Sequence, residues 1–285
     1  MSAQDARGPM SNSRSSWLLI APALLLVGVI YFLPLVRVLA ISVIEPEPGF
    51  GNYALLFTSP PIQKVLGTTL WICVFTTAIT LVLAYVVAYV LTHARPTAQR
   101  LMMLGVLLPL WMSVLVRAFA WVTLLRRQGL VNNALIGMGV VDEPLALMWN
   151  EIGVTIGMVH YMLPLGILPM WAAMRDIDGR VLAASRGLGA SATQTFLRVF
   201  FPLSLPGVIG SGLLVFIFSL GFFVTPAILG GGKTIMIAEY INAQVQESLR
   251  WGVGTMLATT LVATILGLML ALSRIVDLRT LFGAK

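Results

Sequence analysis

The chain has 285 residues, of which 58% are hydrophobic and 10% are charged, and it contains one cysteine. A soluble domain has about 25% charged residues, so this composition excludes a soluble protein, and it also excludes disordered and disulfide-rich chains. A mean hydropathy of +0.94 favours a polytopic α-helical membrane protein, in which the net charge of +7 reflects topology rather than nucleic-acid binding.

Six apolar segments are long enough to cross a bilayer, which takes about 20 residues. The first follows a polar tail, residues 1–16. A cleaved signal peptide is the alternative there, but the apolar run is too long and no cleavage site follows, so we expect an uncleaved helix. The predicted spans are residues 17–37, 67–92, 101–125, 151–173, 202–229 and 251–273, within one transmembrane domain, 17–275.

The charges between these spans predict the orientation. Six spans place both termini on one side, where the segments 1–16, 93–100, 175–198 and 274–285 hold eleven of the eighteen basic residues and four of the eleven acidic ones. The rest of the chain has seven of each, so the whole net charge lies on one side. The positive-inside rule makes this side the cytoplasm, and the tail 276–285 is predicted to lie there.

Motifs for catalysis and metal binding are missing from the sequence. Gly230 to Thr234 ends like a phosphate-binding loop, but Ala227 stands where that motif needs a glycine, so we predict a turn at the membrane surface. His93 and His160 lack the spacing of a metal site. We therefore predict no enzyme, no metal site and no cofactor. Apart from Glu151 at the edge of the fourth span, the spans contain no acid, which argues against a proton-driven carrier.

The loop between the fourth and fifth spans, residues 175–201, carries the strongest functional pattern. Residues 181–188 form a short helical patch with small side chains on its surface, and Gly189 allows a turn after it. A second amphipathic piece enters the membrane at Pro202. The pattern predicts a helix that lies parallel to the membrane and fits the groove of a partner.

This segment resembles the cytoplasmic E-A-A-x-x-x-G loop of permease subunits in bacterial ABC importers. The match covers 183–185, Gly189 and 199–202, and Ala183 stands where the motif has glutamate. The resemblance implies a coupling helix that docks on a separate ATPase subunit. The residues it assigns to the coupling loop are Ala183, Ala184, Ser185, Arg186, Gly189, Ala190 and Pro202.

Further motifs extend the resemblance over most of residues 17–275. Residues 116–121 with 129–133, 157–164 and 223–226 are similar to spermidine/putrescine-type permeases. The resemblance implies an all-α type I importer permease in the bacterial inner membrane that moves a polyamine by alternating access. An opine, an amino-acid-like compound or ferric iron is the alternative solute.

The same resemblance implies the partners of this chain. They are a second homologous permease subunit, two ATPase subunits that bind ATP and magnesium, a periplasmic solute-binding protein and membrane lipid, with no nucleic acid. A stand-alone secondary carrier and a membrane enzyme or scaffold are the rival classes, and activity without partners would distinguish them.

Arg117 is a charge inside the third predicted span. Burying an unpaired arginine costs at least about 2.5 kcal/mol, so we expect a partner among carbonyls near Pro109 or Pro164 or the carboxylates of Glu151 or Glu239. With such a partner Arg117 is a structural pin, and without one it is a candidate for the solute path. The candidate path or gate residues are Trp111, Arg117, Trp121, His160, Tyr161, Phe222 and Thr225.

Aromatic and small residues near this arginine have two interpretations. Trp111 and Trp121 are ten residues apart, close to one helical face, where they form an aromatic belt or attract a cationic solute. His160 fits an interhelical hydrogen bond, and Gly153 with Gly157 forms a G-x-x-x-G pair that predicts close helix packing.

Overall fold

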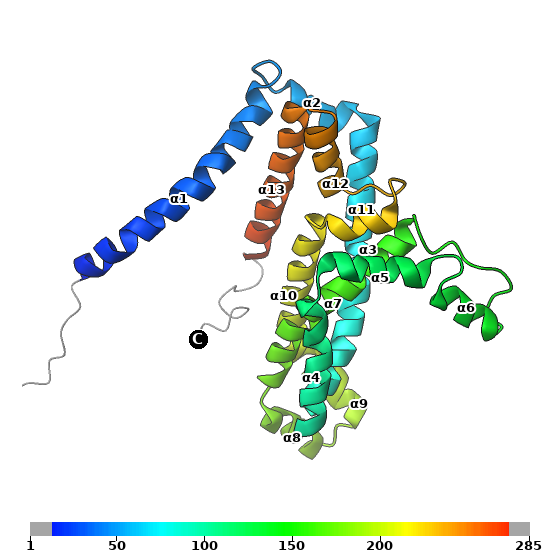
Figure 1. The fold of residues 1–285 in the computed structure, drawn as a ribbon. Coiled ribbons are helices and arrows are strands. Elements are labelled where there is room, and N and C mark those ends of the chain that lie inside the picture. Colours follow the sequence, from blue (N-terminus) through cyan, green and yellow to red (C-terminus); the bar gives the residue numbers. More distant parts are fainter. Residues whose placement is uncertain (1–12, 274–285) are drawn as a thin grey trace, which may run out of the picture.

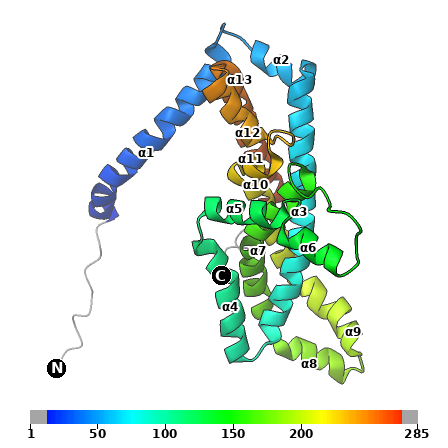
Figure 2. The ribbon, with the colours of Figure 1, turned by 45° about the vertical axis from the view of Figure 1, so that its right-hand side comes forward.

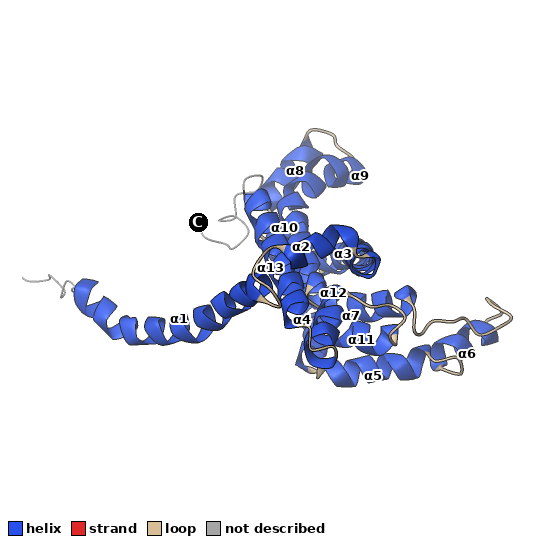
Figure 3. Ribbon diagram, turned by 90° about the horizontal axis from the view of Figure 1, so that it is seen from above, coloured by secondary structure: helices blue, strands red, loops and turns tan. Residues whose placement is uncertain are grey.

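The structure, a computed structural model, describes residues 13–273, and all regular structure within this range is helical (Figure 3). Figures 1 and 2 show the helix of residues 60–93 running the length of the molecule, with other long helices beside it toward either end and short helices crossing at mid-height. Most of the predicted N-terminal tail, 1–16, and all of the C-terminal tail, 276–285, lie outside the described residues. Five helices are long and apolar enough to cross a bilayer, or six with one bent pair.

Three helices form the centre of the molecule: α3 (Pro60–His93), α7 (Glu151–Arg175) and α10 (Phe201–Leu220). Small residues let them approach closely, as helix contacts in lipid require. A Cβ added to Gly207 of α10 would lie 2.5 Å from the Cβ of Ala173 in α7. The central helices therefore form one tightly packed unit.

A second group of helices meets at one end of the molecule, which we name the α2 end (Figure 1). It consists of α1 (Ser13–Ile44), α2 (Gly51–Thr58), α12 (Ile237–Asn242), the π-helix η2 (Ala243–Glu247) and α13 (Trp251–Ser273). Helix α1 packs mainly against α13 and leans away from the central helices. Its large apolar side chains are exposed, with Leu25 at 69% and Tyr31 at 71%, so this helix relies on lipid or a partner to cover it.

The third predicted span, 101–125, is not one helix. The chain forms α4 (Pro96–Trp111) and α5 (Val114–Leu125), with a bend of 101° between α4 and the segment Val114–Gly137, which includes α6 (Leu130–Gly137). Met112 and Ser113 have extended backbone angles at the break. The apolar run continues through the bend, so hydropathy alone does not detect it.

The fifth predicted span, 202–229, ends earlier than expected. Helix α10 stops at Leu220, and Val224–Gly230 forms a separate helix, α11, which packs across α5 and α7. In the first turn of a helix a proline removes no intrahelical hydrogen bond, because the first N–H groups have no partner there. Pro226 occupies the third position of this new helix.

The loop after α7 forms the opposite end of the molecule, which we name the α8 end (Figure 1). It contains α8 (Gly179–Gly187), α9 (Ala192–Thr195) and a π-helical turn η1 (Phe196–Phe200) that continues into α10. Helix α8 lies outside the candidate spans, between Glu151–Arg175 and Ala192–Leu220. The element with the family resemblance thus projects from one end of the bundle.

Candidate functional site

The N-terminus of α8 is fixed by Asp178. Its Oδ1 accepts a hydrogen bond from the backbone N of Arg180 at 2.9 Å, and the Arg180 Nη2 lies 2.7 Å from Oδ2. The Arg180 side chain, helped by its backbone N–H, holds the pKa of the Asp178 carboxyl below its usual range. Because this pKa is lowered, Asp178 is ionised at neutral pH and the cap is fully formed there. The cap is lost as the pH falls through the lowered pKa and the carboxylate is protonated.

The C-terminus of α8 closes in a left-handed turn at Gly189, whose φ is +88°. The N–H of Gly189 donates to the Arg186 carbonyl at 3.0 Å, and the N–H of Ala190 donates to the Ser185 carbonyl at 3.2 Å. These two bonds form a Schellman motif, which usually requires glycine at the left-handed position. The turn predicted at Gly189 is present, and it reverses the chain toward α9.

Helix α9 is joined to α8 by side-chain hydrogen bonds. Ser191 and Gln194 form a capping box at the start of α9. The Ser185 hydroxyl donates to the Leu182 carbonyl at 3.1 Å, so it accepts a hydrogen bond from the Thr195 hydroxyl, 2.9 Å away. We name the unit of α8, α9 and η1 the coupling hairpin; this bond closes it.

Aromatic side chains attach the coupling hairpin to the bundle. Leu182, Phe196 and Phe200 pack into the apolar cluster formed by α3 and α7. The ring of Tyr89 on α3 meets Phe196 and Phe200 nearly edge-on, with centroid distances of 5.5 and 5.3 Å. Edge-to-face contacts of this kind add to the energy of burial and fix orientation. The hairpin is therefore in direct contact with the central helices.

The predicted coupling residues lie on two sides of this hairpin. Ser185 faces inward, toward Thr195. Ala183, Ala184, Arg186 and Gly189 are exposed, Ala190 is half-buried, and Pro202 is exposed on α10, just beyond the hairpin. Sequence reasoning missed Leu188, which caps α8 and is 90% exposed. Its signal was an apolar residue just before the turn glycine.

Arg117 of α5 is buried, with 4% of its surface exposed, and lies at the bend. Its Nη2 donates to the carbonyl of Pro109 and to that of Met112, at 3.3 Å for Met112. The guanidinium lies over the ring of Tyr161, 4.8 Å from the centroid. A cation at the C-terminus of α4 complements the helix dipole. Among the partners considered from the sequence, the structure uses the carbonyl of Pro109.

The same guanidinium has unused hydrogen-bonding capacity. Its Nε and Nη1 are buried and have no hydrogen-bond partner among the described residues. A buried donor without a partner is costly and uncommon in native proteins. Arg117 thus stabilises the bend through Nη2 and keeps two unpaired donors, Nε and Nη1, inside the described part of the molecule.

Other predicted path residues gather beside Arg117. The indole Nε1 of Trp121 donates to Nδ1 of His160 at 3.1 Å, which joins α5 to α7. The rings of Tyr161 and Phe222 are 4.4 Å apart, which joins α7 to the segment between α10 and α11. An arginine and four aromatic or imidazole rings therefore meet where the crossing helices contact α7.

Two predicted residues lie apart from this group. Trp111 is 82% exposed at the end of α4, and the expectation that it shares a helical face with Trp121 is wrong because the chain bends between them. Thr225 is buried against Gly157, whose added Cβ would lie 2.6 Å from the Thr225 methyl and 2.5 Å from Leu229. The close packing predicted at Gly157 is thus confirmed.

The long loop between α5 and α7 is held by contacts that sequence reasoning did not foresee. Asn132 accepts from the backbone N of Leu145 at 2.9 Å and donates to its carbonyl at 3.0 Å. The backbone N of Trp149 donates to the Leu229 carbonyl at 2.8 Å, and its ring covers Gly231 so closely that a Cβ would lie 2.3 Å away. In the sequence the only signals were the asparagines at 132–133 and the glycine run 230–232, neither of which names its partner.

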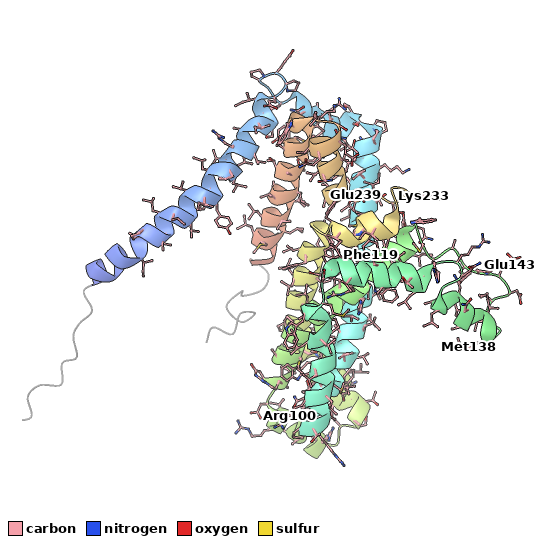
Figure 4. The ribbon with its side chains drawn as sticks, viewed as in Figure 1. Arg100, Phe119, Met138, Glu143, Lys233 and Glu239 are labelled. Atoms are coloured by element: carbon pink, nitrogen blue, oxygen red, sulfur yellow. The ribbon has the colours of Figure 1, made fainter. Side chains whose placement is uncertain are left out.

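The segment Gly230–Thr234 is a turn, as predicted. Gly231 and Gly232 have φ values of +55° and +72°, and the N–H of Lys233 donates to the Gly230 carbonyl at 3.0 Å. Figure 4 shows Lys233 and Glu239 toward the α2 end and Arg100 near the α8 end. The segment whose end resembles a phosphate-binding loop is thus a tight turn that follows α11.

Comparison with known proteins identifies relatives over most of the chain. Residues 81–280 match the protein family described as "Binding-protein-dependent transport system inner membrane component". The spermidine/putrescine transport system permease protein PotB of Haemophilus influenzae is 32% identical over 246 residues, which cover 83% of this chain and 86% of the relative. The Escherichia coli inner membrane ABC transporter permease protein YdcU is 29% identical over 238 residues, covering 75% of each.

A solved structure has the same fold. A chain of a bacterial ABC transporter involved in the import of the acidic polysaccharide alginate superposes with a TM-score of 0.71. The sequence identity is 18%, and the superposition covers 92% of this chain and 96% of the other. The arrangement of bundle, crossing helices and hairpin is therefore one that a known importer subunit adopts.

Proposed function

The chain belongs to the family of binding-protein-dependent transport system inner membrane components, and on this premise we propose that it forms half of the path of a polyamine importer. It is a multi-pass inner membrane protein and the permease subunit of an ABC importer, whose complex includes ATPase subunits and a periplasmic binding protein. A permease subunit is not itself catalytic; the ATPase partner binds ATP.

The observation that carries the mechanism is the attachment of the coupling hairpin. Its helix α8 is capped at both ends by its own chain, and its inner side is anchored to α3 and α7 through Leu182, Phe196 and Phe200. Closure of the ATPase subunits around ATP displaces α8 as a rigid piece. The central helices follow, and the path changes its open side, which is alternating access.

The topology follows from the same assignment. The ATPase subunits are cytoplasmic, so the α8 end lies in the cytoplasm and the α2 end faces the binding protein. This orientation agrees with the basic residues of the inner segments, Arg100 and Arg175 among them, and places both termini in the cytoplasm. A second, homologous permease completes the path.

Two observations support the polyamine. The PotB relatives, at 32% identity, carry spermidine and putrescine in their names. Tyr161 and Phe222 form a ring pair, Trp121 and Phe222 pack against the same apolar cluster, and aromatic faces attract amines.

A second candidate is a solute with a carboxylate, such as an opine or an amino-acid-like compound. The unpaired Nε and Nη1 of Arg117 favour it, because each is a charged donor from which a carboxylate oxygen accepts a strong hydrogen bond. A free amine would instead meet a fixed positive charge at this point.

The test is transport by the reconstituted complex. The chain, co-purified with its permease and ATPase partners, is placed in liposomes with the binding protein outside and ATP inside. We expect ATP-dependent uptake of radiolabelled spermidine that excess putrescine blocks. Uptake of a carboxylate-bearing solute without spermidine would favour the second candidate. Flux through the chain alone, with no ATPase, would favour the stand-alone carrier.

A further inference from the structure

The outer surface of α8 is divided into three strips. Leu182 and Ser185 face the bundle, since Leu182 packs into the core cluster and Ser185 bonds to Thr195. With 3.6 residues per turn, residues two and five positions from Leu182 lie on the opposite side. The middle strip consists of small residues, Ala183, Ala184 and Gly187. On one side of it lies an apolar flank, Val181 and Leu188, and on the other side a basic flank, Arg186.

The apolar flank is exposed outside the membrane. Leu188 is 90% exposed and Val181 46%, and α8 lies outside the candidate spans. The left-handed turn at Gly189 fixes Leu188 at the outer corner of the hairpin. Val181 and Leu188 are seven residues apart, two turns of helix, so they lie on one line and form an apolar edge that a partner can cover.

The basic flank carries a charge without an internal partner. Arg180 is paired with Asp178, whereas Arg186 is exposed and, between residues 13 and 273, forms no ion pair or hydrogen bond through its side chain. After Asp178 the sequence has no acid before Glu239. The docking face therefore offers a free cation and no carboxylate, and Ala183 occupies the position where E-A-A loops have glutamate.

We propose that α8 docks in an ATPase groove whose walls differ, with an apolar pocket for Leu188 on one side and an acidic residue for Arg186 on the other. The polar contact that E-A-A loops make through a permease carboxylate is thereby reversed in sign. This inference rests on the proposed function, since it needs an ATPase partner. The consequence is that α8 discriminates between ATPase subunits, because a basic residue in the groove would repel Arg186.

The test uses the complete complex, purified through a tag on this chain. Arg186→Glu and Leu188→Ala should each weaken retention of the ATPase subunit about tenfold, the first by charge repulsion and the second by loss of an apolar anchor. Arg100→Glu is the matched control: Arg100 is exposed at the same end of the molecule but on α4 (Figure 4). We expect its ATPase retention to equal that of the unmodified chain.

Two further measurements separate the possible failures. Size-exclusion profiles show whether each variant is folded, and Arg186→Gln, a milder change, should remove most of the salt dependence of ATPase retention. If Arg186→Glu and Leu188→Ala retain the ATPase normally in an importing complex, the docking face is wrong and the permease assignment stands. If the unmodified chain retains no ATPase, both proposals fall.

Discussion

At Gly189 the backbone is left-handed, yet no atom lies within 4 Å of the place where a Cβ would stand. A substitution there meets backbone strain and no clash. We expect Gly189→Asn to preserve ATPase stimulation, Gly189→Ala to cost about 1–2 kcal/mol of hairpin stability, and Gly189→Val to abolish transport with normal membrane insertion. Uptake and ATPase rates of the purified complex check this order. Normal uptake by the valine variant would contradict the coupling role.

Arg117 unites the end of α4 with α5 and α7. In Arg117→Gln the charge at the carbonyls of Pro109 and Met112 is lost, and so is the contact with Tyr161. Hydrogen bonds to a charged group are worth about 1.5–3 kcal/mol, so thermal unfolding in detergent should occur at a lower temperature. Uptake should fall as well, and Arg117→Lys should retain more of both. Full uptake in Arg117→Gln would remove this residue from the path.

A candidate residue was predictable from the sequence where its residue type is unusual for the surrounding segment. A charge in an apolar run pointed to Arg117, and a glycine after a short helix pointed to the turn at Gly189. The exposure of Leu188 was not predictable, because an apolar residue has the same hydropathy in a core and on a docking surface. Trp111 was misplaced because its prediction assumed a straight helix.

Helix contacts in this molecule depend on glycines at particular depths. Gly157 of α7 touches Thr225 and Leu229 of α11, whereas Gly105 of α4 has nothing within 4 Å of its Cβ position. Gly157→Val should separate the two helices at a cost of about 1–3 kcal/mol and reduce uptake. Gly105→Ala, the control, should be neutral or raise stability by about 0.5–1 kcal/mol. Thermal stability of both variants tests the contrast.

The hydroxyl pair of Ser185 and Thr195 closes the coupling hairpin. Thr195→Val keeps the size of the side chain and deletes the donor, while Ser185 still donates to Leu182. We expect the α8–α9 contact to lose about 0.5–1.5 kcal/mol of stability. Amide exchange in α8 should be faster in the variant than in the unmodified chain, while exchange in α7 should be the same in both. Equal protection of α8 in both proteins would show that aromatic packing alone closes the hairpin.

The long helices were predictable from sequence, because about 20 apolar residues in lipid leave the backbone no alternative. The breaks were not, since the apolar run continues through Met112 and through Gly221. In both places tertiary contacts decide the outcome: Arg117 takes the carbonyls at the first break, and α11 packs across α5 and α7 after the second.

For the whole molecule the proposed topology is testable by labelling, because the single native cysteine, Cys73, is buried. Leu188→Cys should react with a membrane-impermeant maleimide only in inside-out vesicles, and Lys233→Cys only in right-side-out vesicles. The unmodified chain, the control, should not react in either. The reverse pattern would overturn the proposed orientation, although the helix packing described above would be unaffected.

The contact between α1 and α13 joins the first and last described helices. During synthesis at about 5–20 residues per second, more than 200 residues separate these helices, so α1 waits in the bilayer for roughly 10–40 s before its partner emerges. Until α13 follows, α1 lacks the helix that supplies most of its contacts within the described chain. During this interval α1 depends on lipid to cover its apolar side chains, most of which stay exposed even after α13 has packed against it.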